Sequence, residues 1–113
     1  MNTLFISFLL AVLPIVNQTN SSVSMSGNID PRPGEATVFT VFPDNDSYTY
    51  VWDCDGHWDN LEKYFDFSIS GNQITVTPKE MKVQMLRLNC SVYDENGNYL
   101  GMDEAEIIWH WTN

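Results

Sequence analysis

After residue 22 the chain alternates apolar and polar side chains with the two-residue period of β-strands. The clearest stretch is 83–93, where every second residue from Leu86 to Val92 shares one face and the intervening residues share the other. The same period predicts further strands at 23–25, 35–42, 47–53, 61–70, 74–77 and 98–111. This part of the sequence contains no long apolar stripe at helical spacing.

Short segments rich in Gly, Pro, Asn and Asp separate these strands, at 30–34, 43–46, 55–60, 71–72, 78–80 and 94–97. Asn96-Gly97 is the strongest hairpin signal, because this dipeptide tolerates the positive φ angles of the favoured two-residue turns. Short strands with regularly spaced turns predict an all-β fold, a single antiparallel β-sandwich of about seven strands. We expect Trp52 and Trp109 to lie in its core.

The first residues have a different pattern. Residues 4–16 form an uncharged apolar run that would reach only about 20 Å as a helix, less than the ~30 Å hydrocarbon core of a membrane. We therefore predict a signal peptide at 1–21, cleaved after Ser21, and a domain at 22–113 that is secreted or displayed at the cell surface. No Lys or Arg precedes the run, so the alternative is a retained apolar strand or helix that packs on the domain or on a neighbouring subunit.

The composition is strongly acidic, with 15 acidic and 5 basic residues and a net charge of −10. Such a surface repels phosphate backbones and anionic lipids, so neither nucleic acid nor a peripheral membrane surface is an expected partner. It is compatible with cations, with basic partners and with simple solubility. The four Trp, five Tyr and six Phe supply the apolar area that a core of this size needs.

Export would place Cys54 and Cys90 in an oxidising compartment, where they fit one disulfide worth about 3–4 kcal/mol in the chain-entropy model. Two cysteines this far apart are poor evidence for a metal site. Asn-x-Ser/Thr sequons begin at Asn17, Asn20, Asn45 and Asn89. The first two would leave with the signal peptide, so Asn45 and Asn89 are the glycosylation candidates.

The densest acidic cluster is Asp53, Asp55, Asp59 and Glu62, around Gly56. Oxygen ligands are what Ca²⁺ requires, so Asp53, Asp55 and Asp59 are candidate calcium ligands, although the spacing departs from a standard calcium loop. The alternative is that these acids are simply solvated, as in any strongly acidic chain.

Trp58 and Trp111 are the tryptophans placed where they could remain exposed, and each is a candidate platform for a sugar ring or a protein partner. His57 and His110 stand outside any recognisable nucleophile motif, and neither G-x-S-x-G nor H-E-x-x-H occurs. The sequence therefore predicts no catalytic residue and no cofactor.

Three runs carry a family resemblance. The segments 48–56 (YTYVWDCDG), 70–78 (SGNQITVTP) and 88–97 (LNCSVYDENG) resemble PKD-like and related immunoglobulin-like extracellular domains. One feature departs from the immunoglobulin pattern, because Cys54 follows Trp52 instead of preceding it. The resemblance then implies that the strands of Trp52 and Cys90 are neighbours in one sheet, and that a Cys54–Cys90 bond would staple that sheet.

Domains of this kind bind proteins or glycans, space out larger domains or build surface structures. The resemblance thus implies a non-enzymatic adhesion or binding module whose partner is a protein or a glycan. The alternative is a structural subunit of a filament, coat or appendage that keeps its apolar N-terminal segment between subunits.

Overall fold

The computed structural model describes residues 22–55 and 61–110. The predicted signal peptide at 1–21 lies outside the described residues, as do His57, Trp58, Asp59 and Trp111. The described part of the chain contains seven strands and one short 3-10 helix, η1. Their bounds are β1 Ser24–Gly27, β2 Thr37–Phe42, β3 Thr49–Asp55, η1 Leu61–Lys63, β4 Phe65–Ser70, β5 Gln73–Pro78, β6 Gln84–Tyr93 and β7 Tyr99–Trp109.

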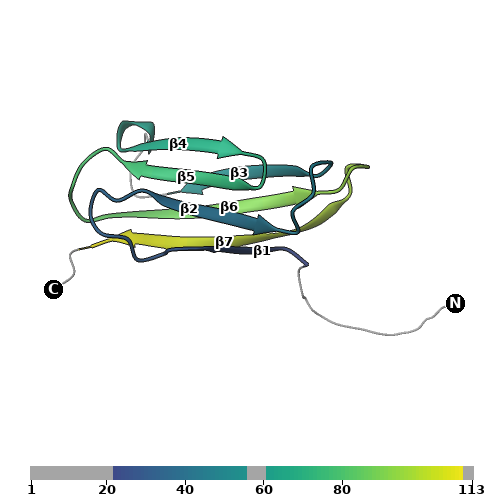
Figure 1. Ribbon diagram of the computed structural model, residues 1–113, viewed down its shortest axis with the longest axis horizontal. Helices are drawn as coiled ribbons and strands as arrows, with labels where there is room; N and C mark the ends of the chain where they lie inside the picture. The colour runs from purple at the N-terminus through teal and green to yellow at the C-terminus, as the bar shows by residue number, and fades with distance from the viewer. Residues whose placement is uncertain (1–21, 56–60, 111–113) are drawn as a thin grey trace, which may run out of the picture.

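The strands form two antiparallel sheets that lie face to face (Figure 1). One sheet has the order β1-β2-β5-β4 and the other the order β3-β6-β7. This is the four-plus-three arrangement of constant-type immunoglobulin sandwiches. The predicted all-β, seven-stranded antiparallel sandwich is confirmed.

The core lies between the sheets because each strand turns its apolar alternate residues inward. Trp109 is fully buried at the end of β7, with its ring centroid 5.2 Å from that of Phe65. Its indole Nε1 donates a hydrogen bond of 2.7 Å to the carbonyl oxygen of Glu35. Both sheets contribute to the main buried cluster, which consists of Phe39, Phe65, Ile74, Val76, Leu86, Leu88, Ile107 and Trp109.

The start of the segment 61–70 differs from the prediction of one continuous strand. Leu61–Lys63 forms η1, closed by a 3.0 Å hydrogen bond from the N–H of Tyr64 to the carbonyl of Leu61, and β4 begins only at Phe65. Leu61 is half-buried against the core, and Glu62 and Lys63 are both exposed. A strand would turn one of these two charged residues to each face, whereas a single helical turn leaves both in solvent.

The expected Cys54–Cys90 disulfide is not formed, and both residues are free thiols. Strands β3 and β6 are neighbours, as the resemblance implied, but the register pairs Cys54 with Leu88 and Trp52 with Cys90. The two cysteines are therefore diagonal neighbours, a relationship in which the Cα atoms lie about 7–8 Å apart. A disulfide needs its Cα atoms closer than about 7 Å, so the intra-sheet staple would require the backbone to move.

Both thiols face the core side of their sheet. Burial raises the pKa of Cys90 to about 11. Burial, with a further contribution from the charge of Asp53, raises the pKa of Cys54 to about 11. At neutral pH both groups are therefore protonated, uncharged and poor nucleophiles, which fits buried cysteines that serve packing.

The predicted hairpin joins β6 to β7, and Gly97 adopts a φ of 84° within it. Asp94 stabilises the turn, because its carboxylate accepts hydrogen bonds from the N–H groups of Asn96 and Asn98, at 2.9 and 2.8 Å. These bonds, led by the one from the Asn98 backbone, lower the pKa of Asp94 below its ordinary value.

Candidate functional site

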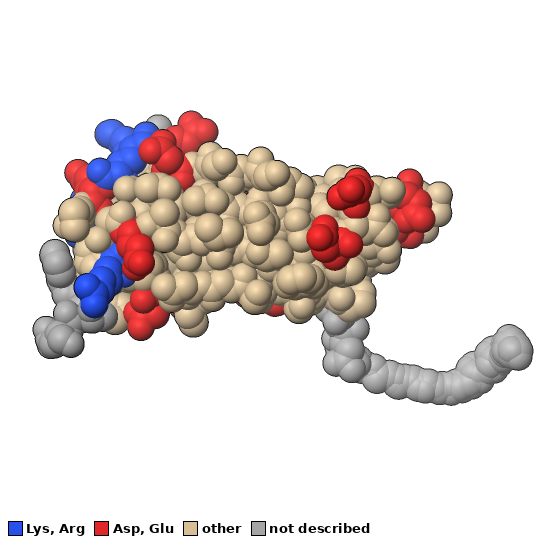
Figure 2. All heavy atoms as spheres, in the orientation of Figure 1, with Lys and Arg blue, Asp and Glu red and all other residues tan. Residues whose placement is uncertain are grey.

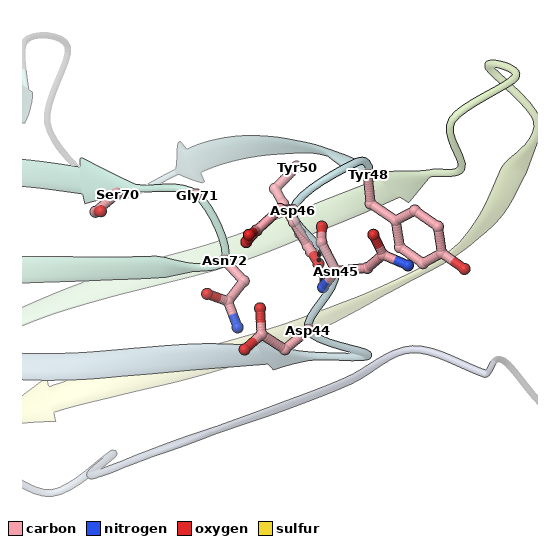
Figure 3. Close-up of a pocket in the computed structure, with 8 residues that line it drawn as sticks. All are labelled: Asp44, Asn45, Asp46, Tyr48, Tyr50, Ser70, Gly71 and Asn72. Atoms are coloured by element: carbon pink, nitrogen blue, oxygen red, sulfur yellow. Dashed lines mark hydrogen bonds between the residues drawn. The ribbon is translucent and has the colours of Figure 1, made fainter.

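One end of the sandwich carries a hollow of about 330 Å³, which Figure 3 shows in close-up. Two connections build it: the loop between β2 and β3, and the tight turn between β4 and β5. These connections are far apart in the chain. They meet because β2 and β5 are antiparallel neighbours, so the end of β2 lies beside the start of β5. The lining residues are Asp44, Asn45, Asp46, Tyr48, Tyr50, Ser70, Gly71 and Asn72.

The β2–β3 loop is held by the hydroxyl of Tyr50. This hydroxyl donates to the carbonyl of Pro43 at 2.6 Å and accepts from the backbone N–H of Asn45 at 3.0 Å. Asn45 in turn accepts a 2.9 Å hydrogen bond from the N–H of Ser47 on its own side-chain oxygen. The loop is therefore closed by side chains from both of its ends, a local bonding pattern for which Asn is well suited.

The β4–β5 turn is anchored to both sheets. Gly71 takes the φ of 56° that the turn requires, and its carbonyl accepts a 3.0 Å hydrogen bond from the indole of Trp52 on β3. Asn72 exchanges hydrogen bonds with Val41 of β2: its side-chain N–H₂ donates to the Val41 carbonyl at 3.0 Å, and its own carbonyl accepts from the Val41 N–H at 2.9 Å. The β2–β3 loop and the β4–β5 turn, which line the hollow, are thus both hydrogen-bonded to residues of β2 or β3.

The hollow is rich in hydrogen-bond acceptors. The carboxylates of Asp44 and Asp46 and the carboxamide of Asn72 face the same opening between the two connections (Figure 3). Within the described residues, neither carboxylate takes part in a hydrogen bond or an ion pair, and both residues are exposed. Among the described residues that line the hollow there is no Lys or Arg. Its two carboxylates are therefore available to a ligand that carries hydroxyl or amino groups.

Charge is distributed unevenly along the long axis of the sandwich. The end with the hollow carries acids in the β2–β3 loop and in the β6–β7 hairpin and shows no basic side chain on the visible face (Figure 2). These acids are Asp44, Asp46, Asp94 and Glu95. The basic residues lie at the other end or toward it, in the β1–β2 connection, in η1, between β5 and β6 and in the first half of β6, and they are Arg32, Lys63, Lys79, Lys82 and Arg87. We call the end with the hollow the acidic end.

Two of the three candidate calcium residues lie in the part of the chain that the structure describes. Asp53 and Asp55 lie within β3, both exposed, and Asp59 lies outside the described residues. The Asp55 carboxylate is 3.6 Å from the guanidinium of Arg87, which competes with a cation for it. Among residues 22–55 and 61–110, no group of three potential ligands is assembled.

The two sequon asparagines occupy different settings. Asn45 is exposed in the β2–β3 loop and lines the hollow. Asn89 is half-buried in the middle of β6, paired with Asp53 on one side and Glu104 on the other. His110 stands at the opposite end of the sandwich, where its imidazole Nε2 contacts the carboxylate of Asp30. The other aromatic candidates, Trp58 and Trp111, lie outside the described residues.

Sequence reasoning missed the hollow, since the segments 43–46 and 71–72 read only as turns. The sequence did contain one signal: each of the two turns includes Asn or Asp and lies next to a predicted strand that contains aromatic residues. That signal becomes specific only when the pairing of β2 with β5 brings the two turns together.

Comparisons with protein-family models, with curated proteins and with solved structures gave no match. In the described part of the chain, no helix has the length and apolar character needed to cross a membrane.

Proposed function

We propose that this protein is an exported, non-enzymatic binding module of the PKD-like kind, and that it holds a glycan in the hollow at its acidic end. The observation that carries the proposal is the hollow itself: two free carboxylates and a carboxamide around one opening, on a hydrogen-bonded framework. The apolar leader and the sequons support export. Because sandwiches host many functions, the fold alone would not carry this conclusion.

The chemistry of the hollow favours sugar hydroxyls. A sugar presents many O–H groups in a fixed arrangement, and Asp44, Asp46 and Asn72 offer acceptors and donors that can match them. The volume of about 330 Å³ is at the lower end of the range of small-ligand sites, which is about 300–1,000 Å³. The described lining of the hollow has two carboxylates and no basic side chain, so it should repel sialylated or sulphated glycans, and neutral sugars and amino sugars are the expected ligands.

The test is a titration of the whole domain with neutral, amino and acidic oligosaccharides, followed by calorimetry and by amide NMR shifts. We expect binding of neutral or amino sugars with shifts confined to the residues of the hollow. Asp44→Asn and Asp46→Asn keep the side-chain shape, and each should weaken binding by about tenfold, the loss of one charge-assisted hydrogen bond. Glu95→Gln, in the neighbouring hairpin and outside the hollow, is the matched control and should have no effect.

Three outcomes would overturn the proposal that the hollow binds a glycan. The first is no binding by any sugar class, and the second is equal loss with Glu95→Gln, which would indicate a general charge effect. The third is loss with Trp58→Ala while Asp44→Asn binds normally, which would assign glycan binding to the tryptophan.

Export is tested separately by the intact mass of the protein from its native source. A chain that begins near residue 22 supports the cleaved signal peptide. A chain that still begins at Met1 would contradict it and would favour the alternative of a filament or coat subunit.

A further inference from the structure

The outward-facing side of the sheet β3-β6-β7 combines exposed apolar residues with acids. We call this surface the β6 face, defined by the outward residues Thr49, Val51, Asp53, Asp55, Met85, Arg87, Asn89, Ser91, Tyr93, Tyr99, Met102, Glu104, Glu106 and Ile108. The alternation that buries the other side of β6 forces these residues toward solvent.

The apolar part of the β6 face spans all three strands. Val51, Ser91 and Met102 stand in one cross-strand row, with Val51 48% and Met102 39% exposed. The next row holds Tyr93 and Tyr99, whose ring centroids are 5.5 Å apart, and Tyr99 is 57% exposed. Adjacent exposed apolar residues on a folded domain are typical of surfaces that bind another protein.

The acidic part borders the apolar part directly. The row next to Val51 and Met102 contains Asp53 and Glu104, on either side of Asn89. Within the described residues, neither carboxylate has a basic partner. The row beyond holds Arg87, which lies 3.6 Å from Asp55 and 3.4 Å from Glu106 and so neutralises only part of the charge there.

The opposite side of the sandwich differs in chemistry. The outward residues of β2, β4 and β5 are mostly Ser, Thr and Gln, with Val38 and Phe42 as exposed apolar residues and Asp66 as the acid among them. This sheet lies toward the viewer in Figures 1 and 2, and the broad middle of the visible face carries no charged side chain. The β6 face differs in that its acids Asp53 and Glu104 border the exposed apolar row and have no basic partner among the described residues, whereas Asp66 lies 3.7 Å from Lys79.

We infer that the β6 face docks a protein partner that presents Lys or Arg beside an exposed aliphatic or aromatic side chain. The apolar group of the partner would cover Val51, Met102 and Tyr99, and its cations would reach Asp53 and Glu104. A second copy of this chain fits badly, because it would set two acidic faces against each other. This inference does not depend on the hollow, which lies at the acidic end and shares no residue with the β6 face.

The test begins with a displayed library of random peptides selected on the whole domain. Selected peptides are then synthesised, and their dissociation constants are measured by fluorescence anisotropy. We expect peptides that combine Lys or Arg with aromatic or aliphatic residues. Glu104→Lys and Met102→Ser should each raise the dissociation constant by about tenfold or more.

The opposite sheet provides matched controls. Asp66→Lys reverses an exposed acid and Val38→Ser removes an exposed apolar side chain, and each should change the dissociation constant by less than about twofold. All four positions are exposed, and thermal unfolding of each variant verifies that the fold is intact.

Several results would overturn the inference. One is selection of neutral or acidic peptides, or of none, and another is a loss with the control variants equal to the loss with Glu104→Lys. A third comes from sedimentation equilibrium of the domain alone: a dimer that Met102→Ser dissociates would show that the β6 face receives a second copy. Glycan binding in the hollow is expected to be unchanged in all four variants, so the two proposals fail independently.

Discussion

The carboxylate of Asp103, on the last strand, accepts a 2.8 Å hydrogen bond from the backbone N–H of Met25, on the first strand. The two residues belong to different sheets, since β1 pairs with β2 and β7 pairs with β6. Asp103 faces inward and is half-buried, and its other oxygen accepts from the N–H of Glu104. One carboxylate thus links the two sheets along the edge where β1 and β7 approach each other.

Removal of this link should destabilise the domain. Asp103→Leu leaves the N–H of Met25 without its acceptor and should lower the free energy of unfolding by about 1–3 kcal/mol. Asp103→Asn keeps an acceptor oxygen and should cost less. Urea denaturation measures both, with Glu104→Gln as the exposed neighbouring control. Equal stability of Asp103→Leu and the native chain would contradict a structural role for this hydrogen bond.

Loss of the Tyr50 hydroxyl should loosen the hollow without unfolding the domain. Tyr50→Phe removes one donor and one acceptor from the β2–β3 loop, and we expect about 1 kcal/mol of destabilisation together with weaker glycan binding. Amide hydrogen exchange at Asn45 should become faster, since its N–H loses its partner. Tyr99→Phe alters an exposed hydroxyl and should change neither property; if it weakened glycan binding equally, the loop would not be the cause.

Free thiols at Cys54 and Cys90 predict an alkaline loss of stability. Their pKa values are about 11 in the folded chain against a reference value of 9.0, so the unfolded chain releases these protons first as the pH rises. Stability from the protonated thiols should be complete below about pH 9 and should fall progressively toward pH 11.

Urea midpoints at pH 8 and pH 10.5 measure this effect, and they should differ less in Cys90→Ala than in the native chain. A native chain whose pH response matches that of Cys90→Ala would contradict the free-thiol arrangement, as would failure of a thiol reagent to label the urea-unfolded, unreduced protein.

Glycosylation of Asn45 should compete with a ligand in the hollow, because Asn45 belongs to its lining. Protein from a eukaryotic secretory host should carry a glycan at Asn45 and bind free sugar at least about tenfold more weakly than protein from bacteria. Ser47→Ala destroys the sequon and keeps Asn45, so it should restore binding in the eukaryotic material. Full affinity with an Asn45 glycan in place, shown by peptide mass spectrometry, would contradict the prediction.

The local pattern of apolar, polar and turn residues was enough to predict most of the fold. The alternation at 83–93 named both the buried and the exposed face of β6, and Asn96-Gly97 marked the final hairpin. Of the two tryptophans predicted to lie in the core, Trp109 is fully buried. Trp52 is half-buried, and its indole donates a hydrogen bond to the β4–β5 turn. The segment 61–64 was the main local error, since period alone does not distinguish a helical turn from the start of a strand.

The site was much less predictable, because it depends on which strands become neighbours and in which register. Asp44 and Asn72 are separated by a long stretch of chain, and they share a hollow only because β2 pairs with β5. The same dependence explains why the expected disulfide is not formed. The resemblance implied that β3 and β6 are neighbours, but the register pairs Cys54 with Leu88 and so places the two thiols diagonally.

Apart from η1, the sequence by itself therefore determined the strands, their faces and their turns, since these follow from the two-residue period and from residues with special backbone preferences. Tertiary structure alone decided the hollow, the acidic end and the union of Val51, Met102, Asp53 and Glu104 on one face. The physical reason is that side-chain alternation is a property of each strand separately, whereas strand order and register come from the packing of two whole sheets around one core.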